Sequence, residues 1–119
     1  MIFGLNNIEG IYLHREHVDF RKSIDGLASL VEQEMKLDVF GQHLFIFCNR
    51  NRTRMKVLYW DVTGFALWYK RLEEDKFIWP HKHESATINI TAQQLEWLLS
   101  GYDVWKMKGH KKIKYAQVF

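Results

Sequence analysis

The amino-acid sequence predicts an α+β fold in which two helices pack with an antiparallel β-meander of about five strands. Two amphipathic segments, one between Asp19 and about Lys36 and a shorter one after Thr91, repeat apolar residues at helical spacing. Between them, short apolar runs alternate with polar turns, as in a meander. The 119 residues fit a single domain. We expect this domain at residues 1–103 and a basic C-terminal tail at residues 104–119.

The N-terminal part is predicted to contain one strand and the longer helix. Residues 10–13 form the strand, and Asp19 occupies an N-cap position at the start of the helix. The apolar face of that helix consists of Phe20, Ile24, Leu27, Val31 and Met35.

Four apolar runs then predict the strands of the meander. The runs are residues 44–48, 55–60, 65–71 and 77–79, and Pro80 ends the last of them. The third run could also form a helix, because Leu and Ala favour one. Aromatic residues dominate it, however, and favour a strand.

The C-terminal part is predicted to contain the last strand and the second helix. Residues 87–90 form the strand, and Thr91 and Gln94 have the T-x-x-Q spacing of a capping box. Gly101 is placed at the C-terminal cap. Beyond residue 103 the chain forms either a hairpin or an arm ordered by a partner.

Composition narrows the class of protein. Hydrophobic residues make up 47% and aromatic residues 15% of the chain, which argues against intrinsic disorder. The single cysteine, Cys48, cannot form an internal disulfide, so a reducing compartment is favoured. No secretory signal is visible, and no apolar run approaches the roughly 20 residues that span a bilayer. We therefore expect a cytoplasmic protein without a membrane partner.

The cationic residues are concentrated in two segments, although the net charge is only +3. If the first segment is extended, its side chains all point to one side, because residues two apart share a face of a strand. Such a stripe suits a nucleic-acid backbone, whereas the alternative is a solubilising loop that protects a sheet edge. The residues are Arg50, Arg52, Arg54 and Lys56 in the first segment and Lys106, Lys108, Lys111, Lys112 and Lys114 in the tail.

Catalytic patterns are weak in this sequence. Cys48 lies within an apolar run, where a thiol is usually inert. The carboxylates lie mostly in predicted turns, and no glycine-rich phosphate loop is present. The histidines are expected at the surface. The triplet 81–83 is similar to the His-hydrophobic-His motif of nucleases with a tyrosine nucleophile, but its middle residue is lysine. We expect no catalytic residue, no metal site and no cofactor.

Several blocks of the sequence resemble one family when taken together. Residues 19–27 resemble its D-x-R-K-G-h-D-G-L stretch, in which h is hydrophobic, although Ser23 replaces the usual glycine. Further matching blocks are residues 44–50 and 56–61, and a third block matches at residues 64, 65, 67, 69–73, 77, 79 and 80. The closing helix matches at Thr91, Leu95, Leu98, Leu99 and Gly101. The family is the accessory protein encoded beside the transposase in insertion-sequence-66 elements.

The resemblance implies a non-catalytic accessory factor for DNA transposition of an insertion sequence. Its implied partners are a catalytic transposase and a second small accessory protein of the same element. The first hypothesis is direct contact with element DNA through the nine cationic residues named above. The alternative is an interaction module that docks on the transposase without binding DNA. Its anchors would be Trp105, Tyr115 and Phe119, because Trp and Tyr dominate interface hot spots.

Overall fold

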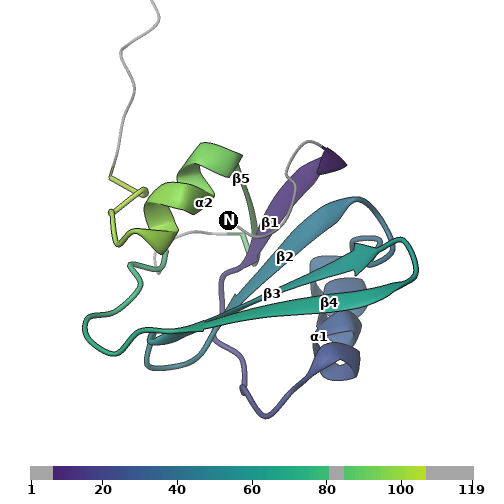
Figure 1. Ribbon diagram of the computed structural model, residues 1–119, viewed down its shortest axis with the longest axis horizontal. Coiled ribbons are helices and arrows are strands. Elements are labelled where there is room, and N and C mark those ends of the chain that lie inside the picture. The colour runs from purple at the N-terminus through teal and green to yellow at the C-terminus, as the bar shows by residue number, and fades with distance from the viewer. Residues whose placement is uncertain (1–6, 81–84, 107–119) are drawn as a thin grey trace, which may run out of the picture.

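A computed structural model describes residues 7–80 and 85–106 of the chain (Figure 1). These residues form five strands, two α-helices and one π-helical turn that continues the first helix. In chain order the elements are β1 (Gly10–His14), α1 (Ile24–Leu30), η2 (Val31–Met35), β2 (His43–Cys48), β3 (Arg54–Asp61), β4 (Gly64–Arg71), β5 (Thr87–Ile90) and α2 (Ala92–Leu99). None of the helices in the described part of the chain has the length and apolar character needed to cross a membrane.

The five strands form one mixed sheet in the order β4-β3-β2-β1-β5. Strands β2, β3 and β4 are a true antiparallel meander, and β5 is antiparallel to β1. Strand β1, however, runs parallel to β2. Parallel neighbours require a crossover connection, and α1 with η2 supplies it. The predicted α+β class with two helices is therefore confirmed, while the purely antiparallel meander is wrong.

The sheet buries both of its faces. Side chains alternate between the faces along each strand, so Phe45 and Phe47 of β2 pack toward α1, whereas Leu44 and Ile46 pack toward α2. All four of these side chains are fully buried. This explains why β2 is an unbroken apolar run instead of an alternating one.

The first helix begins later than the sequence predicts. The Asp19 carboxylate accepts a hydrogen bond from the Arg21 amide at 2.9 Å, and the Asp19 carbonyl accepts one from the Lys22 amide at 3.0 Å. Asp19 thus stabilises a separate turn, and the N-cap of α1 is Ser23. The predicted end is confirmed, because Lys36 adopts a left-handed conformation with φ of 56° directly after η2.

Residues 77–79 are not a strand, which corrects the fourth run of the predicted meander. Phe77 and Trp79 are nevertheless almost fully buried against the α2 face of the sheet. The Phe77 amide donates to the Arg52 carbonyl at 2.8 Å, so the segment is held by a loop contact and not by a ladder. The apolar residues of this segment therefore indicate burial and not a strand.

The predictions for the third apolar run, the capping box and the glycine after the second helix are confirmed. The third run forms strand β4 and not a helix. In α2, the Gln94 amide donates to the Thr91 hydroxyl at 3.1 Å, and the Thr91 amide donates to the Gln94 side chain at 2.8 Å. Gly101 follows the helix with φ of 91°, a conformation that favours glycine. Val104 is buried in the core, so the packed chain reaches at least this residue.

Candidate nucleic-acid interface

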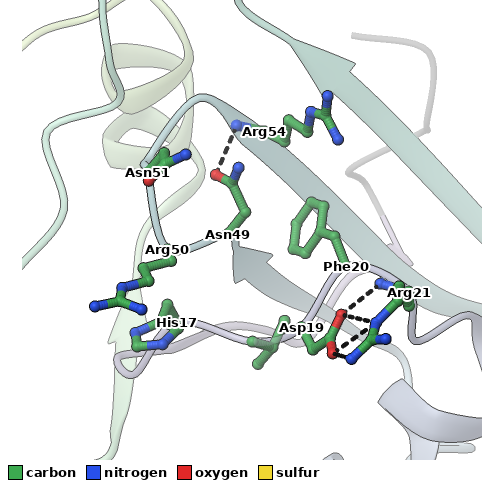
Figure 2. Close-up of a pocket in the computed structure, with 9 residues that line it drawn as sticks. His17, Asp19, Phe20, Arg21, Asn49, Arg50, Asn51 and Arg54 are labelled. Atoms are coloured by element: carbon green, nitrogen blue, oxygen red, sulfur yellow. Dashed lines mark hydrogen bonds and ion pairs between the residues drawn. The ribbon is translucent and has the colours of Figure 1, made fainter.

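The turn between β2 and β3 carries the first cationic segment, and Asn49 shapes it. The Asn49 side-chain oxygen accepts a hydrogen bond from the Thr53 amide at 2.9 Å. It accepts a second from the Arg54 amide at 3.0 Å (Figure 2). Arg52, which lies between Asn49 and Thr53 in the turn, adopts a left-handed conformation with φ of 61°. Asn is well suited to this role because its short side chain bonds readily to nearby backbone. The segment is therefore curled, and the prediction of four cationic side chains on one side of a strand is wrong.

Lys56 is the clearest departure from the predicted stripe. Only 8% of the residue is exposed, on the α1 face of β3. Its ammonium donates to the carbonyls of Phe20 at 3.0 Å and Lys22 at 2.8 Å, and lies 4.8 Å from the centre of the Phe20 ring. Burial lowers the pKa of Lys56. This ammonium fastens the loop before α1 to the sheet and is not presented to a phosphate.

Arg52 is also directed inward. Its guanidinium carbon lies 5.7 Å from the centre of the buried Trp79 ring. The same arginine lies beside Cys48, whose pKa burial raises to about 11. Cys48 is thus a neutral packing residue, as its apolar surroundings predicted. Arg52 joins the turn to residues 77–79, so it has a structural role that the spacing of the cationic residues did not reveal.

Arg50 and Arg54 are exposed and lie beside an open depression of about 580 Å³. Arg21 also lines this depression, which is formed where the β2–β3 turn faces the loop before α1. Figure 2 shows the Arg50 guanidinium beside His17 and that of Arg54 on the other side of the turn. We call this site the basic depression. Its polar and charged lining is His17, Asp19, Arg21, Asn49, Arg50, Asn51 and Arg54.

The charge of the basic depression is incompletely balanced. Asp19 is its carboxylate, and it binds Arg21 through contacts of 2.9 Å and 2.5 Å. This pairing lowers the pKa of Asp19 to about 2, so the carboxylate is ionised at neutral pH. Within the described residues, neither Arg50 nor Arg54 forms an ion pair. The site therefore offers two uncompensated guanidinium groups to an anion.

Residues 9–109 match the family model described as IS66 Orf2 like protein. The chain belongs to the IS66 Orf2-like family. It is also similar to two uncharacterized proteins of Sinorhizobium fredii. One, y4hO, is 35% identical over 96 residues, which cover 81% of this chain and 82% of the relative. The other, y4jC, is 31% identical over 104 residues, which cover 87% of each chain. No solved structure matches the chain.

Membership of the IS66 Orf2-like family gives the protein an accessory role associated with transposition. The family is one of accessory proteins and not a known class of enzymes. The sequence blocks described above implied the same family. The two relatives carry no described activity, so they add no binding residue to the site.

The C-terminal residues of this IS66 Orf2-like chain are only partly described. Lys106 is exposed, and its ammonium lies 3.9 Å from the Asp103 carboxylate. Trp105 is partly buried, and its indole N–H donates to the Ile78 carbonyl at 2.6 Å. Its role as a partner anchor stays a prediction. The other predicted site residues, Lys108, Lys111, Lys112, Lys114, Tyr115 and Phe119, lie outside the described residues.

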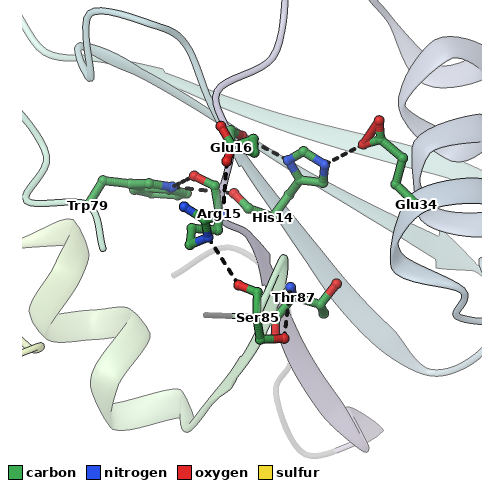
Figure 3. Close-up of polar contacts among 7 residues, drawn as sticks. All are labelled: His14, Arg15, Glu16, Glu34, Trp79, Ser85 and Thr87. Carbon is green, nitrogen blue, oxygen red and sulfur yellow. Dashed lines mark hydrogen bonds and ion pairs between the residues drawn. The ribbon is translucent and has the colours of Figure 1, made fainter. Parts of the chain in front are cut away.

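His14 is not at the surface, contrary to the sequence prediction. It is 4% exposed, and its ring nitrogens lie 2.7 Å from the Glu34 carboxylate and 2.8 Å from the Glu16 carbonyl (Figure 3). This contact links the end of β1 to η2.

The triplet 81–83 lies outside the described residues. Within the described part of the chain, no group of three potential ligands could hold a metal ion.

Arg21 and His17 are the interface residues that sequence reasoning missed. The regular apolar spacing that begins at Phe20 places Arg21 within the predicted helix. Its position in the depression follows from the turn at Asp19, which directs the loop toward the β2–β3 turn. The D-x-R spacing at residues 19–21 was the available signal, since a short Asx turn brings such side chains together.

Proposed function

We propose that this IS66 Orf2-like protein assists transposition by binding element DNA, without catalysis, through the basic depression. Arg50 and Arg54 contact phosphates, and Arg21 lies beside them. The observation that carries the proposal is the pair of exposed guanidinium groups that have no carboxylate partner among the described residues.

The form of the depression supports an extended anionic partner. It is an open surface feature between two loops, with guanidinium groups on both sides of the turn. Arginine binds phosphate through a planar fork of N–H donors, and each neutralised phosphate releases a counterion. The exposed amide side chain of Asn51 supplies a neutral donor at the same turn. Contacts of these kinds position a protein on a duplex and carry little sequence information.

Salt-dependent binding tests the proposal directly. We expect the protein to bind element-end DNA in a fluorescence anisotropy titration. The double variant Arg50→Ala/Arg54→Ala should weaken binding about 10- to 30-fold at low salt. The slope of log K against log salt should become shallower by about 1.8, because two phosphate contacts are lost at about 0.9 each.

Lys36→Asn is the matched control for this experiment. Lys36 is an exposed cation at the end of η2, away from the depression, and Asn tolerates its left-handed backbone. Its removal should change affinity less than either single arginine substitution. An unchanged salt slope in the double variant would remove the depression from the DNA-binding surface. Binding seen only when the transposase is present would instead favour the docking alternative.

Removing the one carboxylate of the depression should have the opposite effect. Asp19→Asn frees Arg21 from its ion pair, while the amide oxygen can still accept the turn hydrogen bond from the backbone. We expect DNA binding at neutral pH to become about 3- to 10-fold tighter and the salt slope to steepen by up to about 1. Equilibrium anisotropy measures both quantities. A weaker complex, with the thermal midpoint unchanged, would contradict the placement of DNA beside Arg21.

A further inference from the structure

Strand β4 is a sheet edge that no described strand covers. It lies at one of the two edges of the sheet, with β5 at the other (Figure 1), and no strand among the described residues pairs with its outer side. It forms eight consecutive pairs with β3 without a bulge and contains no proline. Its first six residues, Gly64 to Tyr69, are uncharged, and its cations are confined to its last two. Natural proteins usually protect such an edge with charges, bulges or proline, unless another strand binds there.

The outward backbone groups of β4 follow from its turn. Asp61 and Gly64 close a two-residue turn and are direct partners, so alternate residues from Gly64 onward bond to β3. The amides and carbonyls of Phe65, Leu67 and Tyr69 therefore face the open edge. A strand that pairs here meets three residues with free backbone donors and acceptors.

The side chains of β4 are complementary to those of a second, antiparallel copy. A two-fold axis perpendicular to the sheet keeps the α1 face of both copies on the same side. Residues on the same face of the two β4 strands therefore lie opposite each other. If the axis passes beside Leu67, Leu67 of one copy lies opposite Leu67 of the other. This register sets Phe65 opposite Tyr69 of the second copy, and aromatic cross-strand pairs are favourable. The Tyr69 ring lies 6.4 Å from that of Phe20 in the same chain, and the residue is still 48% exposed, so the open part of the ring is available for this contact.

Charge also favours the antiparallel copy. In the same register Lys70 lies opposite Gly64 of the second copy, which has no side chain to obstruct it. In the second copy, the next strand is β3, and its Asp61 pairs with Gly64 and lies on the same face of the sheet. Each Lys70 can therefore reach an Asp61 carboxylate across the axis, and the contact occurs twice. A parallel arrangement would instead bring the cationic ends together.

We propose that the protein forms a two-fold dimer in which the β4 edges of two copies pair antiparallel about Leu67. The sheet then continues across the axis. The α1 face of the new sheet carries a row of aromatic rings that includes Trp60 and Phe65 of one copy, 5.0 Å apart, and Tyr69 of the other. The proposal is independent of DNA binding, since it uses none of the cations of the basic depression.

Sedimentation equilibrium of the full chain without DNA tests this proposal through a charge exchange. Asp61 and Lys70 lie at opposite ends of the hairpin, roughly 20 Å apart at about 3.3 Å per residue, so they cannot pair within one copy. Asp61→Lys or Lys70→Glu alone should weaken the dimer about tenfold, because attraction becomes repulsion at two places. The double variant Asp61→Lys/Lys70→Glu should return to within about threefold of the natural protein.

Two exposed tyrosines supply a matched pair of further variants. Tyr69→Ser should weaken the dimer about tenfold, since it removes an aromatic pair twice. Tyr102→Ser, which changes a tyrosine 58% exposed beyond α2, should leave it within about twofold. If the unsubstituted protein remains monomeric at about 100 μM, the proposal is overturned. A dimer unaffected by Tyr69→Ser and by both charge reversals also overturns it, because its interface then lies elsewhere.

Discussion

Replacing Trp79 with Ala is expected to lower the free energy of unfolding by about 4 kcal/mol, the largest effect predicted for this chain. The indole is 4% exposed in the core under α2. Its N–H donates to the carbonyls of Arg15 at 3.0 Å and His14 at 3.3 Å (Figure 3). The substitution removes a large buried side chain and leaves backbone acceptors at the end of β1 without their donor. Urea unfolding followed by circular dichroism measures the loss.

Trp79→Phe separates packing from hydrogen bonding. Phenylalanine fills much of the same volume but donates no hydrogen bond, so we expect a loss of about 1–2 kcal/mol. Arg52, whose guanidinium faces the indole ring, can still stack on phenylalanine. A loss below about 1 kcal/mol for Trp79→Ala would mean that residues 77–79 are peripheral to the core.

The strands and α2 were predictable because their signals are local. The apolar run of β2, the aromatic run of β4 and the capping box at Thr91 each follow from neighbouring residues. The parallel pairing of β1 with β2 was not predictable, because a single sequence does not show which strands are neighbours in the sheet. Residues 77–79 show the same limit, since Phe77 and Trp79 are apolar because they are buried, whether or not a strand forms.

The candidate site was predicted only in part, for a geometric reason. A spacing of two places side chains on one face only if the backbone is extended. Asn49 accepts two backbone hydrogen bonds and curls the turn, which separates Arg50 and Arg54 from Arg52. Lys56 does lie on a strand, but the loop before α1 covers it. The burial of Lys56 therefore depends on a loop that is 34 to 36 residues away in sequence.

Replacing Lys56 with Ala is expected to lower the free energy of unfolding by about 3 kcal/mol. The substitution removes the buried hydrocarbon stem, the contact with the Phe20 ring and two charged hydrogen bonds to backbone carbonyls. Lys56→Met keeps the stem and loses only the ammonium, so we expect about 1–2 kcal/mol. Urea unfolding of the two variants separates these contributions.

The same variants distinguish a structural lysine from a DNA contact. Under conditions where Lys56→Met is fully folded, its salt slope for DNA binding should equal that of the natural protein, because the ammonium touches carbonyls and no phosphate. Arg54→Ala, two residues earlier on the same strand, should make the slope shallower by about 0.9. If Lys56→Met reduced the slope by a similar amount while remaining folded, the ammonium would have to leave the Phe20 and Lys22 carbonyls when DNA binds. The loop before α1 would then move on binding, and the basic depression would have a different form in the complex.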